Sequence, residues 1–296
     1  MNKLYYIIVC FKLNVGSHTA DQISAILDIF PCHIFKKNIN EFVIAEMRDN
    51  INGEEQASQI LNALCKTINE NFDAKIYEKD ILPAHDNIPN KLYLYRSWSN
   101  CPIKNMEIIK NHKFYLSDPK YFNDPFDCQM QIYPYTNDKD NLKNNIGIRC
   151  FSSTYNNILM WSHYADEHKG FCIEFDASLL TARSLGEIIK VRYVNKMPTY
   201  LGINSIDIKR FLCYKYKDWA YEKEYRLICL KKETPQFEFP MNAITKVYFG
   251  CRMDENAKKF VRSFVSESNK INDTGIKIIG LRADEDEFAL KEYRDD

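Results

Sequence analysis

The sequence predicts an α+β protein of two domains, and three observations lead to this prediction. The chain has 296 residues, 45% of them apolar, which is enough for a packed core in each of two domains. Short runs rich in β-branched and aromatic residues alternate with amphipathic helical segments. Residues 83–90 contain two prolines and several turn-forming residues, so they are predicted to link a first domain at 1–82 to a second at 91–296.

The first domain, residues 1–82, is predicted to be a ferredoxin-like βαββαβ module. Ser17 or Thr19 can cap a first helix that ends near Phe30. Strands are expected at 3–13, 32–36, 41–47 and 74–79, and a second helix at 54–71. Because Lys12 interrupts the first apolar run and no cleavage site follows, a strand is favoured there over a signal peptide. We expect a binding or assembly module through which copies of the chain could form a homo-oligomer.

The second domain is predicted to be a mixed, mostly antiparallel α+β domain that carries the chemistry. Strands are expected at 92–95, 113–116, 147–152, 170–175, 188–193, 224–230, 244–249 and 277–282. Helices are expected at 104–111, 158–164, 205–214 and 255–267. The chain has nine glycines and no glycine-rich phosphate loop, which argues against a nucleotide site of that kind.

Charge and cysteine content narrow the classes of function. A formal net charge of zero removes the argument for nucleic-acid binding from a strong basic excess. Residues 1–86 hold 8 basic and 12 acidic residues against 32 and 28 in the remainder, a mild excess that fits a phosphate-bearing small ligand. The ten cysteines include no CxxC pair, which favours buried thiols in a reduced, cytoplasmic compartment over zinc binding. No segment approaches the ~20 apolar residues of a membrane span.

Residue types typical of active sites gather in four segments of the second domain. These segments are LYLYRS at 92–97, SDPKYFNDPFD at 117–127, CFSST with MWSHYADEHKG between 150 and 170, and WAYEKEYR at 219–226. In this order, FNDPFD, CFS, MWSHYAD and EKEYR resemble a widespread bacterial family known only as a domain of unknown function. The resemblance extends from about Leu92 to Phe249 and leaves the first domain outside it.

A second resemblance implies a mechanism. ADP-ribosyltransferases of the Arg-Ser-Glu type carry an Arg at the end of an early strand, a Ser in a Ser-Thr-Ser motif, and a late Glu-x-Glu motif. The order here is similar: Arg96, then Ser152-Ser153-Thr154, then Glu222-Lys223-Glu224. The resemblance implies NAD as the substrate, and an unknown protein or nucleic acid as the acceptor. A role as a toxin or an anti-phage defence effector is implied by the resemblance alone.

The residue types suit this chemistry. Arg96 would hold the phosphate oxygens of NAD through paired hydrogen bonds, and Ser152 would brace the ribose side. Cleavage of the nicotinamide–ribose bond builds positive charge on the sugar, which Glu224 would stabilise. By the same resemblance, Glu222 would prepare the acceptor. The ligand pocket is expected to be completed by Asn123, Asp124, Trp161 and Tyr164.

Structural interpretations of the same residues stay open. Arg96 could be a salt-bridge partner, and the aromatic side chain of Trp161 could belong to the core. Alternation along a strand puts Glu222 and Glu224 on one face, where Arg226 could neutralise them. In the FNDPFD segment, the two aspartates that flank Pro125 could simply shape a turn.

Two further functions remain as alternatives to the transferase. His163 and His168 are five residues apart, which is not the spacing that aligns two metal ligands on a helix, so no metal site is predicted. A single histidine acting as general acid or base is favoured instead. The first alternative is therefore a nucleotide or nucleic-acid hydrolase that uses His163 with Asp124, Asp127 or Asp166. The second is a non-enzymatic sensor of a nucleotide-like small molecule.

Overall fold

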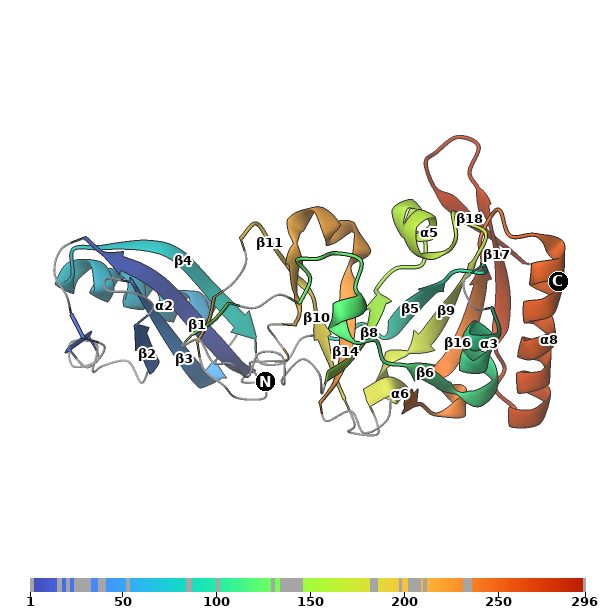
Figure 1. Ribbon diagram of the computed structural model, residues 1–296, viewed down its shortest axis with the longest axis horizontal. Helices are drawn as coiled ribbons and strands as arrows, with labels where there is room; N and C mark the ends of the chain where they lie inside the picture. Colours follow the sequence, from blue (N-terminus) through green and yellow to red (C-terminus); the bar gives the residue numbers. More distant parts are fainter. Residues whose placement is uncertain are drawn as a thin grey trace. The chain divides into compact units, whose positions relative to one another are not determined.

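A computed structural model gives the structure of the protein, and it contains both helices and mixed sheets, so the predicted α+β class is confirmed (Figure 1). The described residues are 3–14, 18–19, 22–23, 33–36, 41–51, 54–83, 87–99, 102–128, 131–133, 146–181, 186–196, 199–201, 209, 212–230 and 236–294. The first of two compact units comprises residues 1–87 with 132–136 and 199–203, and the second comprises 88–131, 137–198 and 204–296. Within the described part of the chain, every helix is too short or too polar to cross a lipid bilayer.

Unit 1 is built on an antiparallel sheet. Its main elements are β1 (Lys3–Leu13), β2 (His33–Lys36), β3 (Glu41–Ile51), α2 (Glu54–Asn71) and β4 (Ala74–Pro83). The strand order is β2-β3-β1-β4, and each registered pair is antiparallel. Leu61, Leu64 and Ile68 of α2 share one buried cluster with residues of β1 and β3, so the apolar face of this helix covers the sheet.

The predicted elements of unit 1 agree with the structure except at their ends. The helix expected to end near Phe30 lies mostly outside the described residues, so the ferredoxin-like arrangement stays a prediction. β3 continues to Ile51 and β4 to Pro83, past the predicted ends at 47 and 79. The reason is that β1 is eleven residues long and pairs along its length with both neighbours, from Lys3↔Ile51 to Leu13↔Ala74.

Unit 2 contains an eight-stranded sheet in the order β10-β14-β8-β5-β9-β16-β17-β18. These strands are β5 (Lys91–Arg96), β8 (Ile146–Ser152), β9 (Phe171–Asp176), β10 (Glu187–Lys190), β14 (Glu224–Leu230), β16 (Ile244–Phe249), β17 (Lys277–Ala283) and β18 (Leu290–Arg294). The β16–β17 pair is parallel, and the other registered pairs of this sheet are antiparallel.

Helices and shorter strands complete the chain after residue 88. The α-helices are α3 (Pro102–Asn111), α5 (Ile158–Tyr164), α6 (Ala177–Thr181) and α8 (Glu255–Asn272). The 3-10 helices are η1 (Pro119–Tyr121), η2 (Lys217–Glu222) and η3 (Met241–Ala243). The short strands are β6 (Lys113–Tyr115), β7 (Gln131–Tyr133), β11 (Arg192–Val194), β12 (Thr199–Leu201), β13 (Tyr214–Tyr216) and β15 (Gln236–Glu238).

Two predicted elements of unit 2 differ from the structure by more than their ends, and the helix expected at 255–267 continues to Asn272. The strand expected at 188–193 is divided at Val191, because its partner β14 begins only at Glu224, after Lys223 in the left-handed conformation (φ 46°). The chain then leaves the large sheet, and β11 pairs in parallel with β13. The helix expected at 205–214 falls largely outside the described residues, and its last residue, Tyr214, is the first residue of β13.

The large sheet has two chemically different faces. Leu92, Leu94 and Phe151 lie on one face in a large apolar cluster, which also contains buried residues of α3 and α8. The alternate residues Tyr93 and Tyr95 lie on the other face and pack with α5. The second face is aromatic and polar, so it is where ligand-binding groups are to be sought.

The described cysteines are free thiols. Cys10, Cys128, Cys172, Cys213 and Cys229 are buried, whereas Cys65, Cys150 and Cys251 are half-buried. Burial raises the pKa of Cys128 to about 12 and that of Cys229 to about 11, so both thiols are held in the unreactive protonated form.

Gly170 marks a close approach of backbones where β9 begins. A Cβ atom at this position would lie 2.1 Å from the carbonyl oxygen of Arg96 and 2.9 Å from that of Ala165. We expect Gly170→Ala to lower the free energy of unfolding by about 3 kcal/mol, as over-packing against backbone does. Gly275→Ala is the control: φ is +67° there but no atom lies within 4 Å, so about 1 kcal/mol is expected. Urea denaturation measures both, and equal losses would contradict the steric explanation.

Candidate functional site

A cavity of about 420 Å³ opens where β5 and β8 separate. These two strands register at one position, Tyr93↔Ser152, whereas β5 pairs with β9 along its whole length. The predicted site residues on its wall are Arg96, Asn123, Ser152, His163, Tyr164, Glu222 and Glu224. Its volume falls in the range of about 300–1,000 Å³ that is typical of small-molecule sites.

The cavity reaches both faces of the sheet. Its wall includes Leu94 and Phe151 from the apolar face and Tyr95 and Ser152 from the polar face. This is possible because β5 and β8 pair only at Tyr93↔Ser152, where β8 ends, so residues 94–96 and 149–151 are not paired with each other. The cavity therefore offers two ends of different chemistry within one space.

One end of the cavity is cationic. The Nε and Nη2 atoms of Arg96 both donate to Oδ1 of buried Asn105 on α3. Arg149 on β8 also lines the cavity, and its guanidinium lies 5.5 Å from the centre of the Phe114 ring. Its buried Nε has no hydrogen-bond partner among the described residues. Burial, and next the nearby charge of Arg96, lower the pKa of Arg149, so an anion bound there would be stabilised.

The other end of the cavity carries the Glu222–Glu224 pair. Glu222 ends η2, Lys223 takes the left-handed conformation, and Glu224 begins β14 opposite Ser152. Ser152 Oγ donates to the carbonyl oxygen of Glu222 at 2.7 Å, and the Glu224 amide donates to Tyr193 Oη at 2.9 Å. The turn before β14 is thereby fixed, and both carboxylates face the cavity with less than a tenth of their surface exposed.

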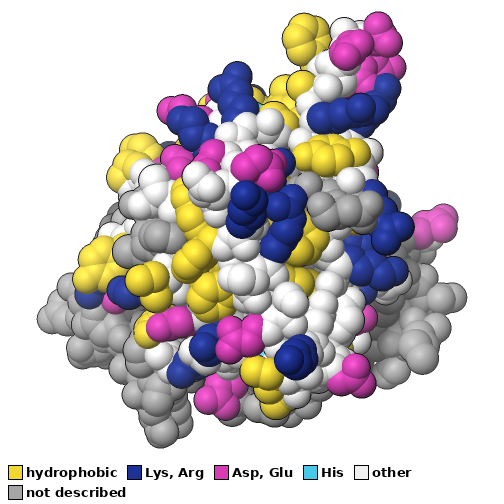
Figure 2. All heavy atoms as spheres, turned by 90° about the vertical axis from the view of Figure 1, so that its right-hand side faces the viewer, with side chains coloured by type: hydrophobic (Ala, Val, Ile, Leu, Met, Phe, Trp, Pro, Cys, Tyr) yellow, Lys and Arg dark blue, Asp and Glu magenta, His cyan; other side chains and the backbone are white. Residues whose placement is uncertain are grey.

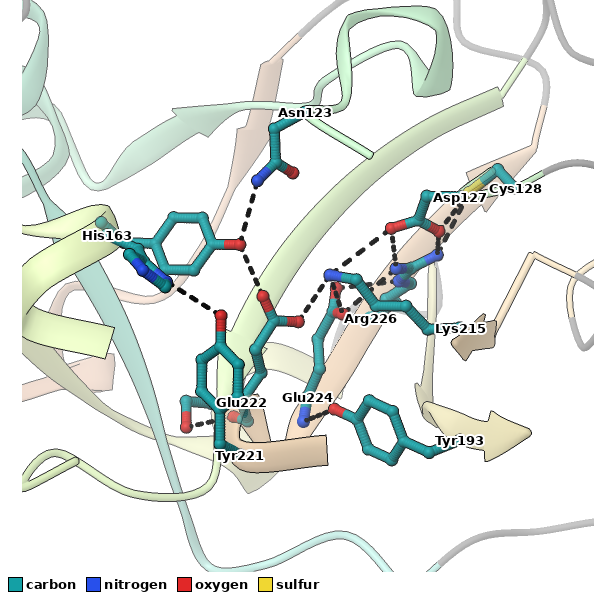
Figure 3. A network of polar contacts seen from close by, with 12 residues as sticks. Asn123, Asp127, Cys128, His163, Tyr193, Lys215, Tyr221, Glu222, Glu224 and Arg226 are labelled. Atoms are coloured by element: carbon teal, nitrogen blue, oxygen red, sulfur yellow. Dashed lines mark hydrogen bonds and ion pairs between the residues drawn. The ribbon is translucent and has the colours of Figure 1, made fainter. Parts of the chain in front are cut away.

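Two buried cations hold these carboxylates (Figure 3). The Arg226 guanidinium donates to Glu224 from Nε at 2.8 Å and to both oxygens of Asp127, at 2.8 and 2.7 Å. Lys215 Nζ lies 2.5 Å from Glu222, 3.3 Å from Glu224 and 3.5 Å from Asp127. We call these five side chains, Asp127, Lys215, Glu222, Glu224 and Arg226, the charged cluster.

Polar side chains extend the charged cluster toward solvent. Tyr164 Oη donates to Glu222 Oε1 at 2.5 Å, and Asn123 Nδ2 donates to Tyr164 Oη at 3.4 Å. His163 Nδ1 lies 2.9 Å from Tyr221 Oη at the exposed edge (Figure 3). Burial and the Glu222 charge raise the pKa of Tyr164, so its phenol stays protonated.

The two glutamates differ in their affinity for a proton. Burial, and next the negative charge of Glu224, raise the pKa of Glu222 to about 7. Burial alone would raise the pKa of Glu224 too, but the charges of Arg226 and Lys215 outweigh it and hold that pKa near 2. Near neutral pH, Glu224 is therefore a fixed anion, whereas Glu222 can gain or lose a proton.

Two predicted site residues do not line the cavity. Trp161 is fully buried: its Nε1 donates to the Tyr155 carbonyl at 2.6 Å, and its ring meets Tyr95 edge-on. The cause is that Asn157 caps α5 so that Trp161 faces the core while His163 faces outward. Asp124 shapes a turn instead, because its Oδ1 accepts from the Phe126 amide at 2.8 Å.

The sequence prediction missed two members of the site and assigned one to a different role. Lys215 and Arg149 were not predicted, and Asp127 was expected as a turn former or as a partner of His163. Arg226 neutralises Glu224 as the structural interpretation held. The sequence does mark Lys215 as unusual, because it is a lysine between two tyrosines in a short strand. Its carboxylate partners lie in other segments of the chain, so the neighbouring sequence does not identify them.

The hydrolase hypothesis pairs His163 with a carboxylate, whereas the described hydrogen-bond partner of His163 is a tyrosine. His163 meets a tyrosine, Asp127 is taken by Arg226, and the Asp166 carboxylate accepts from the Ser99 amide at 3.0 Å. Across the described ranges, no three His, Cys, Asp or Glu side chains are grouped to hold a metal ion.

A larger hollow of about 870 Å³ lies between α8 and strands β17 and β18. Figure 2 shows the side of the molecule on which α8 lies, where basic and acidic side chains are mixed with apolar ones. The hollow is lined by apolar side chains such as Val265 and Ile278 together with Arg262, Lys277 and Glu292. The charged cluster lies elsewhere, so the cavity at the β5–β8 opening is the candidate site.

Comparison with known proteins bears on the segment that carries much of this site. Residues 160–227 match the model of a family described as "Protein of unknown function (DUF2971)". The predicted resemblance to a domain of unknown function is therefore confirmed for this segment. The matched segment contains His163, Tyr164, Lys215 and residues 222–226, which include the end of η2 and the start of β14. No curated protein and no solved structure gives a significant match to the chain.

The raised pKa of Glu222 predicts a pH-dependent stability. A carboxyl group with a raised folded-state pKa contributes stability that is complete below its ordinary pKa of 4.5 and is lost as pH rises through about 7. We expect the free energy of unfolding of the wild type to fall across this window, by up to about 1.4 kcal/mol per pH unit, relative to Glu222→Gln, and the melting temperature to fall with it. Glu238→Gln, on an exposed strand position, is the matched control. Parallel wild-type and Glu222→Gln curves would contradict a proton on Glu222.

Proposed function

We propose that unit 2 is an ADP-ribosyltransferase-like enzyme that cleaves NAD at the nicotinamide–ribose bond. The observation that carries the proposal is one cavity, at an opening between two antiparallel strands, lined by Arg96, Ser152, Glu222 and Glu224. These residues end β5, end β8 and flank the start of β14, in the order that the resemblance requires. A cationic end and an anionic end suit a ligand with a pyrophosphate and a ribose that becomes positive.

The cationic end would hold the pyrophosphate. Arg96 and Arg149 both line the cavity, and a phosphate between them would offset the repulsion of two guanidinium groups. The buried Arg149 Nε, with no partner among the described residues, is a donor that such a phosphate oxygen would satisfy.

The anionic end would act on the sugar. When the bond from ribose C1′ to nicotinamide breaks, its electron pair moves to the ring nitrogen and neutralises the pyridinium. The ribose then carries the positive charge, which the fixed Glu224 carboxylate stabilises. The acceptor, a water molecule or a group on a macromolecule, bonds to C1′, and its proton passes to Glu222 in its ionised form. The two glutamates thus have separate roles because their proton affinities differ.

The glutamate roles are tested by nicotinamide release. We expect wild-type protein incubated with NAD to release nicotinamide, and Glu224→Gln to do so about 10²–10³-fold more slowly per folded molecule. Because Glu224 also pairs with Arg226 and Lys215, the melting temperature of the same preparations must be measured. A folded Glu224→Gln protein with wild-type activity would assign this residue to charge pairing alone. Absence of release from every preparation would reject the proposed activity.

The phosphate role is tested by Arg149→Met. A phosphate contact is made in both the ground state and the transition state, so its loss is expected to raise KM about 10–100-fold and leave kcat nearly unchanged. The matched control is Arg252→Met, an exposed arginine outside the cavity, which is expected to leave both values unchanged. Equal KM values for Arg149→Met and wild type would remove Arg149 from the ligand site.

The alternatives give different outcomes in the same assays. A sensor would gain melting temperature with NAD or ADP-ribose but release no nicotinamide. A hydrolase would instead act on a nucleotide or nucleic acid and depend on His163. In the setting that the resemblance implies, the enzyme would act as a toxin or an anti-phage effector.

A further inference from the structure

The FNDPFD segment is the motif that the proposed function leaves unexplained, and its last residue is Asp127. The turn that Asp124 shapes brings the Asp127 carboxylate into the charged cluster, where its side chain is 1% exposed. Asp127 accepts from both terminal nitrogens of Arg226 and lies 3.5 Å from Lys215 (Figure 3). An acidic side chain from another part of the chain thus shares the cations that hold the glutamates.

The charged cluster is not balanced when every group is ionised. It contains three carboxylates, Asp127, Glu222 and Glu224, against the two cations Lys215 and Arg226. A net charge is costly in a site removed from water, and buried groups bind or release protons to avoid it. One bound proton makes the cluster neutral.

The contacts identify the carboxylate that keeps the proton. Asp127 and Glu224 each contact both Arg226 and Lys215, whereas Glu222 is paired with Lys215 alone among the described ion pairs. Tyr164 supports either state of Glu222: it donates to the ionised carboxylate, and its oxygen can accept from the protonated one.

We propose that Asp127 is a positioning residue that leaves one proton on Glu222 by taking a share of both cations. If Asp127 were uncharged, two cations would balance two glutamates, and Glu222 would lose its proton at lower pH. The motif therefore keeps Glu222 able to exchange a proton near neutral pH. The consequence for catalysis rests on the proposed function, whereas the proton count does not.

Several ionisable groups face Glu222 from the elements around it. They are Lys215 on β13, Glu224 on β14, Tyr164 on α5, Tyr221 on η2 and Tyr193 on β11. Asp127, in the loop after η1, and Arg226, on β14, act on Glu222 through their ion pairs with Lys215 and Glu224. The three phenols have raised pKa values and stay neutral in this range. The charged groups that set the protonation of Glu222 are thus those of the charged cluster.

The experiment follows the proton without relying on turnover. The pH midpoint of the Glu222 contribution is read from melting temperatures of the full chain between pH 4.5 and 8.5, as the difference from Glu222→Gln in each background. Asp127→Asn is expected to shift this midpoint down by about 1 pH unit or more, because two cations then face two carboxylates. Lys215→Met is expected to shift it up by about 1 unit, because one cation then faces three.

Matched variants separate charge from folding. Asp118→Asn removes the charge of an aspartate that caps the start of η1, nine residues before Asp127, and it is expected to leave the midpoint unchanged. Asp127→Glu keeps the charge and is expected to restore the midpoint even if packing suffers. The Asp127→Asn measurement is repeated with His163→Gln, so that ionisation of the histidine is not counted.

The outcomes test the proton assignment and the proposed function separately. An unshifted midpoint in Asp127→Asn overturns the inference, and so does a shift that Asp118→Asn reproduces. If Asp127→Asn does not fold, Lys215→Met decides, and an unshifted or lowered midpoint there overturns it. If the enzyme releases nicotinamide, the pH profile of kcat is expected to move in the same two directions. If no NAD is cleaved but the midpoints shift, the proton assignment stands and the proposed function falls.

Discussion

The buried guanidinium of Arg226 is the interaction on which the candidate site depends. Its planar fork binds a carboxylate on its own strand and another 99 residues away in sequence, and it also donates to the Leu212 carbonyl. Without it, carboxylates would remain in a place from which water is largely excluded, which typically costs about 3–5 kcal/mol. The loop after η1, the approach to β13 and the start of β14 are thereby held together by one side chain that has no exposed surface.

Most strands of the large sheet were predictable because local sequence and burial agree, whereas β18 and the short strands β13 and β15 were not predicted. Leu92–Tyr95 and Glu224–Leu230 alternate between two environments, and the observed faces follow that period. The break at Val191 was not predictable, because a strand ends where its partner ends, and the partner starts 33 residues later at Glu224. Strand ends in unit 1 follow the same rule. Pairing is non-local, so the length of a strand is a property of its neighbours.

The site was predictable in its residue types and much less in its pairings. The arginine, serine and two glutamates that the resemblance selects, Arg96, Ser152, Glu222 and Glu224, line one cavity. Trp161 and Asp124 were expected to line the cavity because of their residue types alone. The cap of α5 directs Trp161 into the core, and Asp124 forms a turn. Lys215 and Arg149 belong to none of the recognised sequence motifs, so they were not predicted as site residues. Only the fold shows that one neutralises carboxylates while the other keeps a buried donor at the cavity.

Cys128 contacts Arg226 of the charged cluster, so the reactivity of its thiol reports whether the cluster is intact. Its thiol lies 3.1 Å from Arg226 Nη1 and is almost completely buried, and burial raises its pKa to about 12. A thiol in that state reacts only when the surrounding structure opens and lets water and reagent in. The rate at which a thiol reagent modifies Cys128 therefore measures how often the ion pairs separate. Cys128, the residue directly after the FNDPFD segment, is thus a natural chemical probe of local opening at the charged cluster.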